Sequence, residues 1–154
     1  MYGLPLAVTR KANIYGGGDL NFSRIVPDTA RCLIEGKELL IRSDGTPQRD
    51  YLYVEDAVEG YLTLVGQLDR PEVRGKAFNF SLGKPISVLE MVNAVVAVYG
   101  KEITPKVLGE ARGEIDAQYL ANEKAQQVLG WKPRHTLEQG LAKTIEWYKA
   151  YLQK

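Results

Sequence analysis

The chain has 154 residues, of which 45% are hydrophobic and 25% charged, and these shares are ordinary for one globular domain. Its 20 basic and 19 acidic side chains leave a net charge of +1, so the whole chain shows no footprint for nucleic acid or an acidic membrane. No apolar run is long enough to span a bilayer, and the single Cys32 has no disulfide partner within the chain. We therefore expect a cytoplasmic protein without a membrane or nucleic-acid partner, with Cys32 packed in the core.

The first third of the chain predicts strands and one helix. Residues 4–13 are rich in apolar and β-branched side chains and lead to three glycines, which predicts a strand that feeds a loop. Apolar residues then recur at helical spacing over residues 26–35, with Pro27 in the first turn and Gly36 at the end. Two short strands, 39–42 and 51–54, flank turn-forming residues.

The middle of the chain predicts two further helices and a strand. A helix from Glu55 carries one apolar face, at Val58, Tyr61, Leu62, Val65 and Leu68. Residues 77–81 predict a compact strand. Ser87 and Glu90 have the spacing of a capping box, which predicts the start of a helix that ends at Gly100.

The last third predicts a short strand and two helices. The strand is expected at residues 104–108, and Asn122 is expected to cap a helix that Gly130 closes. Thr136 and Gln139 form another capping-box spacing, and the last helix has an apolar face that should dock on the core, formed by Leu137, Leu141, Ile145, Tyr148 and Leu152. Alternating strands and helices predict an α/β fold with some parallel pairing.

Two strings carry the strongest functional signal. Residues 10–16 are RKANIYG, and residues 49–56 are RDYLYVED. They resemble the R-x-x-N-x-Y-G and R-D-Y/F-x-x-V-x-D signatures in the C-terminal half of the extended short-chain dehydrogenase/reductases. That family comprises the nucleotide-sugar epimerases and 4,6-dehydratases.

The resemblance implies an α/β fold that is the C-terminal part of an incomplete NAD(P)-binding Rossmann-like fold, joined to a small mixed α/β substrate domain. In the family, the Gly-rich cofactor turn and the catalytic Tyr-x-x-x-Lys pair come before the first string, where this sequence has only residues 1–9. We expect residues 1–154 to form a single substrate-binding domain whose N-terminal dinucleotide-binding portion is absent. Strands 4–13 and 77–81 would then lack neighbours, which predicts a homo-oligomer or a missing N-terminal Rossmann portion.

The resemblance also implies the substrate-binding residues. Arg49 and Arg112 match the arginines that clamp the substrate pyrophosphate, and Asn13 matches the asparagine that hydrogen-bonds it. Arg24 matches a basic residue near the nucleotide, and the strand lining the base corresponds to Leu40, Ile41 and Arg42. Arginine suits this role because its planar fork binds phosphate oxygens in pairs and stays charged. A lone arginine is more often a surface residue, and Asn13 alone could serve a turn, so the joint occurrence in the family's order is what favours a ligand site.

No residue matches the family's catalytic groups. Tyr15 is not the catalytic tyrosine, because Asp19 stands where the lysine would be. His135 is more typical of a turn than of a base. The adjacent acids Glu55 and Asp56 are typical of the charges at a helix start. Residues 16–18 lack the full dinucleotide pattern, so we expect them to give flexibility at the lip of the site. We predict no catalytic residue, no metal, and no cofactor bound by this chain alone, with NAD implied for the full-length family.

Residues 13–27 look most like the CDP-glucose 4,6-dehydratase group, which favours the nucleotide-sugar-binding part of a dehydratase that is catalytically incomplete alone. A 4-epimerase passes through the same 4-keto sugar and stays open as an alternative. The expected ligand is a CDP-, UDP-, GDP- or dTDP-hexose. Two further alternatives are a stand-alone nucleotide-binding module and a structural remnant that persists because it oligomerises.

Overall fold

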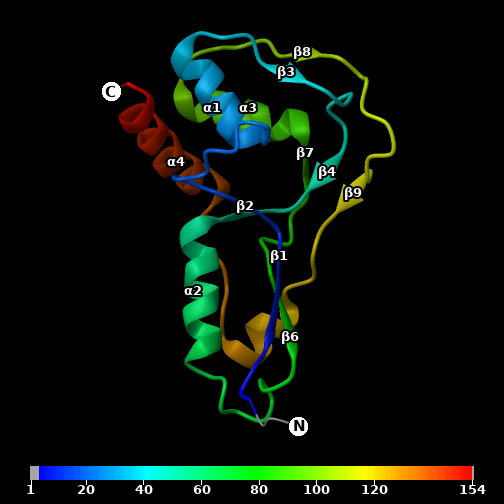
Figure 1. Cartoon of the computed structure of the whole chain (residues 1–154), viewed down its shortest axis with the longest axis vertical. Coiled ribbons are helices and arrows are strands. Elements are labelled where there is room, and N and C mark those ends of the chain that lie inside the picture. The colour runs from blue at the N-terminus through cyan, green and yellow to red at the C-terminus, as the bar shows by residue number, and fades with distance from the viewer. Residues whose placement is uncertain (1–3, 154) are drawn as a thin grey trace.

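The computed structural model describes residues 4–153 and shows an elongated α/β molecule (Figure 1). Helices α1, α3 and α4 pack together at one end, while strands β1 and β6 lie with helix α2 at the other. The helices are α1 (Ile25–Glu35), α2 (Val54–Val65), α3 (Val88–Tyr99) and α4 (Leu137–Leu152), with a π-helical turn, η1 (Ala125–Leu129). The predicted α/β class is confirmed.

Within the described residues, the strands form four small sheets. In three of them two strands run parallel: β1 (Val8–Lys11) with β6 (Ala77–Phe80), β2 (Asn13–Tyr15) with β5 (Tyr51–Tyr53), and β3 (Leu40–Ile41) with β8 (Lys106–Val107). In the fourth, β4 (Gln48–Arg49) lies between β7 (Ile86–Ser87), which is antiparallel to it, and β9 (Ala117–Gln118), which is parallel. The expected parallel pairing is therefore present.

The strand predicted at residues 4–13 changes its partner near its end. β1 runs beside β6, and the Ala12 amide donates to the Phe80 carbonyl at 3.1 Å. The next amide, of Asn13, donates instead to the Asp50 carbonyl at 2.9 Å, and β2 continues beside β5. The switch carries the chain from one end of the molecule to the other and places Asn13 at the junction.

Both predicted capping boxes are confirmed. The Glu90 amide donates to Ser87 Oγ at 3.1 Å, and the Ser87 amide donates to Glu90 Oε2 at 2.6 Å. At the start of α4, the corresponding distances between Thr136 and Gln139 are 3.2 and 2.9 Å. These caps satisfy backbone amides that a helix start leaves without partners, and they fix where α3 and α4 begin.

Apolar core residues gather at both ends of the molecule. At the helical end, the predicted face of α4 buries Leu141, Ile145 and Tyr148 against α1 and α3, and the docking of this helix is confirmed. Beside it, Cys32 is buried at 3% exposure and packs near Leu39, as expected. At the other end, the core is formed by residues around α2, β6 and η1, including Leu52, Phe78, Phe80 and Trp131.

Helix α2 forms where it is expected, but its apolar face is turned to solvent. Val58, Leu62 and Val65 are 50%, 64% and 63% exposed. The inward positions include Ala57 and Gly60, and a Cβ atom on Gly60 would lie 2.8 Å from a ring carbon of Phe80. Small residues therefore decide which side of α2 packs on β6, and the larger apolar residues are left outside.

The segment predicted as a helix capped by Asn122 differs from the expectation. Residues 125–129 form the π-helical turn η1, and Gly130 closes it with a φ of 69°. The Asn122 side chain does not cap backbone amides. Its Nδ2 donates to the Ser81 carbonyl at 2.8 Å, and its Oδ1 accepts from Gln126 at 2.7 Å. A long-range partner has thus replaced the local cap.

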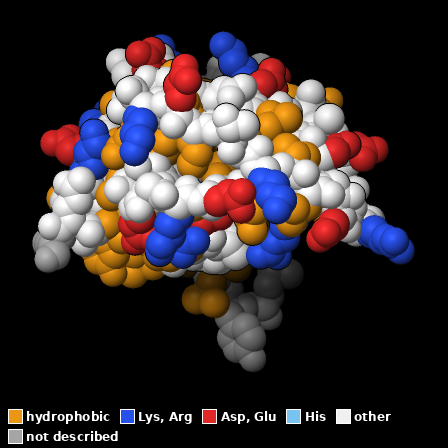
Figure 2. Space-filling view, turned by 90° about the horizontal axis from the view of Figure 1, so that it is seen from above, with side chains coloured by type: hydrophobic (Ala, Val, Ile, Leu, Met, Phe, Trp, Pro, Cys, Tyr) orange, Lys and Arg blue, Asp and Glu red, His pale blue; other side chains and the backbone are white. Residues whose placement is uncertain are grey.

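Two observations concern the helices and one face of the surface. Among the helices of the described part, none has the length and apolar character needed to cross a membrane. On the face in Figure 2, lysine, arginine, aspartate and glutamate side chains are interspersed, so no patch of a single sign dominates that face. On that face, charge-based recognition would depend on individual residues.

Candidate functional site

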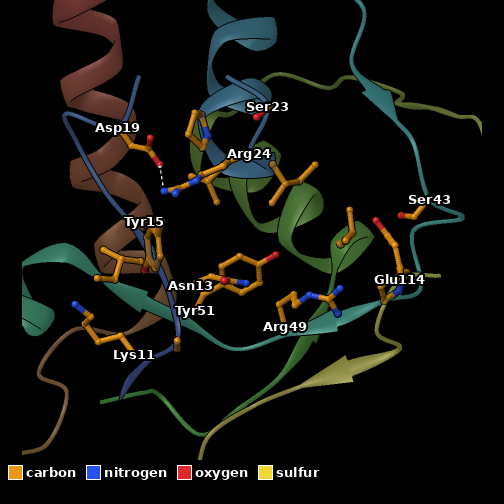
Figure 3. Close-up of a pocket in the computed structure, with 17 residues that line it drawn as sticks. Lys11, Asn13, Tyr15, Asp19, Ser23, Arg24, Ser43, Arg49, Tyr51 and Glu114 are labelled. Carbon is orange, nitrogen blue, oxygen red and sulfur yellow. Dashed lines mark hydrogen bonds and ion pairs between the residues drawn. The ribbon is translucent and has the colours of Figure 1, made fainter. Parts of the chain in front are cut away.

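A cavity of about 580 Å³ opens beside β2 and β5, where the chain passes between the two ends of the molecule. Its walls come from residues 11–15, from the first turn of α1, and from the segment that carries β4 and β5. Val88 and Glu114 complete it from distant parts of the sequence. The two motif strings thus meet at one cavity, as Figure 3 shows.

Asn13 and Tyr51 lie opposite each other in the middle of the cavity wall, because they are paired in the parallel β2–β5 register. Tyr51 is 7% exposed, and burial raises the pKa of its hydroxyl to about 12, with a smaller opposing effect from the positive charge of Arg49. The hydroxyl stays protonated at neutral pH. Tyr51 can therefore donate a hydrogen bond to a ligand, but it cannot serve as a base.

Arg49 is held in place by backbone carbonyls and not by a carboxylate. Its Nη1 donates to the Gln48 carbonyl at 2.8 Å and to the Ile115 carbonyl at 2.6 Å. None of the ion pairs within residues 4–153 involves Arg49. A guanidinium has five N–H donors, and both of these contacts use Nη1, so the donors on Nε and Nη2 take no part in them. Arg49 is a fixed, uncompensated cation on the cavity wall.

Arg24 lines the same cavity from the start of α1. Its Nη1 lies 3.1 Å from Asp19 Oδ2, and its side chain is 61% exposed. The Asp19 carbonyl accepts from the Tyr148 hydroxyl, which ties this loop to α4. Exposed ion pairs contribute little to stability, so Arg24 can exchange its carboxylate partner for an anionic ligand at small cost.

Asp50 holds the backbone that presents Arg49 and Tyr51. Its buried carboxylate accepts the amides of Leu82 and Gly83, both at 3.2 Å, and more weakly that of Leu120 at 3.4 Å. Burial raises the pKa of this carboxyl above its ordinary value, and the hydrogen bonds offset part of the increase. Asp50 does not line the cavity and acts on the site through its neighbours Arg49 and Tyr51.

The other expected substrate-binding residues do not line the cavity. Ile41 is 2% exposed and packs in the core, while Leu40 and Arg42 are exposed. The Arg42 carbonyl accepts the amides of Glu110 and Ala111 at 2.8 and 3.1 Å, which holds the loop before Arg112 against β3. The structure therefore brings Asn13, Arg24 and Arg49 together. Four expected residues lie outside the lining but close in the chain to lining residues: Leu40, Ile41 and Arg42 shortly before Ser43, and Arg112 shortly before Glu114.

Sequence reasoning missed several lining residues. Lys11 and Tyr15 stand inside the first string, and Tyr51 inside the second, so their place in the motifs was the available signal. Ser43 and Glu114 come from loops with no local signal for this position. Burial raises the pKa of Tyr15 above its ordinary value.

The expected turn residue His135 belongs to a polar cluster outside the cavity. Its Nδ1 lies 2.9 Å from Asp56 Oδ1, and the Asp56 carboxylate also accepts the amides of Arg134 and His135 at 3.0 and 3.2 Å. Lys143 Nζ lies 3.3 Å from the other ring nitrogen and 2.7 Å from Glu55 Oε2. Asp56 is thus more than a charge at a helix start, because it fixes the segment before α4 against α2.

Gly16 and Gly17 serve close packing. A Cβ atom on Gly17 would lie 2.5 Å from Trp147 Cγ, and one on Gly16 would lie 2.3 Å from Val54 Cγ1. Side chains at these two positions would push α4 and α2 away. Gly16 and Gly17 therefore make tight contacts with two helices, whereas a Cβ atom on Gly18 would meet nothing within 4 Å.

Comparison with known proteins gives the fold and the family. The family model described as "NAD dependent epimerase/dehydratase family" matches residues 1–80. The chain is 31% identical over 153 residues to dTDP-glucose 4,6-dehydratase 1 of Escherichia coli, covering 96% of this chain and 42% of that protein.

Two solved structures have closely similar folds. UDP-glucose 4-epimerase from Thermotoga maritima, solved with UDP-glucose, matches with a TM-score of 0.85 at 28% identity, covering 95% of this chain and 46% of that one. dTDP-glucose 4,6-dehydratase from Bacillus anthracis, solved with NAD, matches with a TM-score of 0.81 at 26% identity, covering 99% and 47%. The chain thus spans less than half of each of these relatives.

The fold and the site therefore define part of a Rossmann-like α/β protein of the extended short-chain dehydrogenase/reductase class, as the motifs indicated. The matched residues include both motif strings and make up more than half of the chain. The chain belongs to the NAD-dependent epimerase/dehydratase family, whose members matched here are sugar-nucleotide dehydratases and epimerases.

Proposed function

We propose that this chain is the nucleotide-sugar-binding part of an NAD-dependent 4,6-dehydratase with a CDP-glucose-like substrate. The observation that carries the proposal is the meeting of Asn13, Arg24 and Arg49, from three separate elements, at one cavity. A sugar-linked diphosphate carries two negative charges and needs fixed cationic donors. The cavity offers two arginines and a central amide for that purpose.

The lining suggests how the ligand lies. Arg49 keeps free donors on Nε and Nη2, and Asn13 stands beside it, so the diphosphate is assigned to this middle region. The nucleoside is assigned to the end formed by Ser43, Pro47 and Val88, which offers a hydroxyl and apolar walls. Leu40, Ile41, Arg42 and Arg112 would support that end from outside the lining. The sugar then points toward the opposite end, at Lys11.

The part of the reaction that needs NAD is not assigned to this chain. NAD accepts and returns the hydride when it is bound. The glycines closest to a dinucleotide motif, Gly16 and Gly17, are packed against Val54 and Trp147 and form no cradle for a phosphate. Tyr15 and Tyr51 hold their protons at neutral pH. The chain's own contribution is to bind and orient the nucleotide sugar.

We propose that the single domain of residues 1–154 works with a dinucleotide-binding portion or with another copy of itself. Within the described residues, β1 pairs only with β6, and the outward face of α2 is apolar. An unpaired strand edge and an exposed apolar helix face are surfaces that association covers. Light scattering at high protein concentration tests the homo-oligomer, and a strictly monomeric chain would contradict it.

A 4-epimerase is the second candidate, and the likeness to the Thermotoga maritima enzyme favours it. A dehydratase releases water and leaves a 4-keto-6-deoxy sugar, whereas an epimerase only inverts the configuration at C4. NMR of the sugar product, formed by this chain together with a dinucleotide-binding portion, distinguishes the two. A product that keeps its 6-hydroxyl would contradict the dehydratase.

Calorimetric titration tests the binding proposal. The chain is titrated with CDP, UDP, GDP and dTDP and with their hexose conjugates, at low and moderate salt. We expect salt-sensitive binding, and a loss of about 1.5–3 kcal/mol in Arg49→Ala, the usual value of hydrogen bonds to charged groups. Arg49→Lys should recover part of the loss, because a lysine cannot form the paired contact.

The matched control is Arg74→Ala, since Arg74 is half-exposed and pairs with Asp69 away from the cavity. It should bind as the wild type does. Equal affinity in Arg49→Ala and the wild type would remove Arg49 from the site.

A further inference from the structure

Lys11 is the one lysine that lines the cavity, among the residues that the structure describes. It ends β1, where it pairs with Phe80 of β6, and its side chain is half-buried. No carboxylate forms an ion pair with Lys11 in residues 4–153, while Arg24 across the cavity is paired with Asp19. Lys11 is thus a second basic residue of the lining without a carboxylate partner, besides Arg49.

The flexible side chain of Lys11 is fixed by Tyr61 of α2. Its ammonium group donates to the Tyr61 hydroxyl and lies 4.4 Å from the centroid of the same ring. An ammonium group has three N–H donors, so two remain after this contact. A lysine anchored in this way is a positioned donor, which loses less conformational freedom when a ligand binds than a free lysine would.

Lys11 and Arg49 stand at different ends of the cavity. Figure 3 shows Asn13 and Tyr51 between them, with Ser43 and Glu114 on the side of Arg49. The topology agrees, because Lys11 belongs to the β1–β6 sheet and Arg49 to the β7–β4–β9 sheet. A ligand that spans the cavity therefore meets two separate cationic contacts with hydrogen-bonding groups between them.

We infer that Lys11, held by Tyr61, is the residue by which this chain distinguishes a nucleotide sugar from a bare nucleoside diphosphate. The inference rests on the proposed function, which places the diphosphate at Arg49 and the sugar at the Lys11 end. Hexose hydroxyl and carbonyl oxygens accept hydrogen bonds from an ammonium group. Lys11 then contacts the sugar and leaves the diphosphate to the arginines.

A ligand-truncation experiment tests the inference. The wild type and Lys11→Met are each titrated with CDP and CDP-glucose, and with UDP and UDP-glucose as a second pair. The measured quantity is the ratio of the two dissociation constants within a pair, which isolates the contribution of the sugar. We expect the wild type to bind the sugar conjugate more tightly than the bare diphosphate. In Lys11→Met, the ratio of the two dissociation constants should fall about tenfold, which corresponds to the loss of a hydrogen bond to a charged group.

Three further variants separate the possible causes. Lys132→Met removes an exposed lysine outside the cavity and should leave the ratio unchanged, which controls for net charge. Tyr61→Phe keeps the ring but removes the hydroxyl, and should lose only part of the preference. Arg49→Ala should weaken both members of a pair by the same factor, because it acts on the diphosphate that they share.

The outcomes distinguish the two proposals. If Arg49→Ala weakens binding and Lys11→Met leaves the ratio unchanged, the proposed function stands and Lys11 is a structural residue only. Equal weakening of both ligands in Lys11→Met would place Lys11 on the diphosphate and overturn its role at the sugar. If Arg49→Ala has no effect on either ligand, the proposed function fails, and with no binding by the wild type both proposals fail.

Discussion

Replacing Asp50 by alanine should destabilise the junction that carries the cavity wall. Asp50 lies between Arg49 and Tyr51, and its carboxylate accepts three backbone amides from two other segments of the chain. The residue is 2% exposed, so water reaches these amides poorly once the carboxylate is removed. The substitution therefore leaves buried donors without acceptors, and it also frees the strand that presents Arg49.

The magnitude follows from the number and quality of these contacts. An unsatisfied buried donor costs about 1–3 kcal/mol. Two amides lie at 3.2 Å and the third at 3.4 Å, so we count the third as weak and expect a loss of about 3–5 kcal/mol in the free energy of unfolding. This is a large part of the total stability of a typical domain, about 5–15 kcal/mol. Urea unfolding, followed by circular dichroism, measures it.

The asparagine variant separates the charge from the hydrogen bonds. In Asp50→Asn, the remaining oxygen can still accept the amides of Gly83 and Leu120, which bond to Oδ2 in the wild type, but the Leu82 amide loses its acceptor. The free energy of unfolding should therefore fall by about 1–3 kcal/mol, the cost of one unsatisfied donor. Burial raises the folded-state pKa of Asp50 above its unfolded value near 3.9. Proton binding therefore favours the folded state. Protonation of Asp50 therefore contributes to the free energy of unfolding. This contribution is fully present below about pH 4 and is lost as the pH rises through the folded-state pKa.

The stability advantage of the wild type over Asp50→Asn should accordingly shrink as pH rises through that window. Asp69→Ala is the control, because the Asp69 side chain is 98% exposed, and its stability should change by less than about 0.5 kcal/mol. An Asp50→Ala variant that unfolds at the same urea concentration as this control would refute the reasoning.

Two further predictions concern packing and association. Gly17→Ala should lose about 1–3 kcal/mol because its methyl group meets the Trp147 ring, whereas Gly66→Ala, at a φ of −64° with space for a methyl group, should be nearly neutral. Equal stability of the two variants would show that Trp147 moves aside at no cost. Leu62→Lys should change the stability of the monomer by less than about 0.5 kcal/mol, since Leu62 is 64% exposed, and should weaken self-association in light scattering. An unchanged association constant would remove the outer face of α2 from the interface.

The local features of the fold were predictable from the sequence. Both capping boxes depend on residues three positions apart, so their signal is complete within one turn of helix. The docking face of α4 was also evident, because large apolar residues recur at helical spacing and the same residues are buried in the core. Strand and helix alternation was enough for the α/β class.

Features that depend on distant residues were not predictable in the same way. The close approach of Phe80 to Gly60 decides which face of α2 packs, and this contact cannot be predicted from the hydrophobic pattern of α2 alone. Asn122 is held by Ser81, from another segment, and so does not cap its helix. Likewise, the partner change between Ala12 and Asn13 depends on where β5 and β6 lie.

The candidate site shows the same division. Asn13 and Arg49 were predicted through motif resemblance, and the register of β2 with β5 then brings their neighbourhoods together. Glu114 reaches the cavity from a loop whose position is set by backbone contacts with β3 and β4, so no local pattern marks it. The expected base-lining strand was carried over from the family, and here the Ile41 side chain is part of the core.

The most direct test of the central claim is the mapping of amide chemical shifts by NMR, as the isotope-labelled chain is titrated with CDP-glucose and UDP-glucose. The assignment of the cavity as a nucleotide-sugar site predicts concentration-dependent shifts at Asn13, Arg24, Arg49 and Tyr51, while the amides of η1 stay unchanged. No shifts with either ligand, or shifts confined to residues outside the cavity, would contradict the claim.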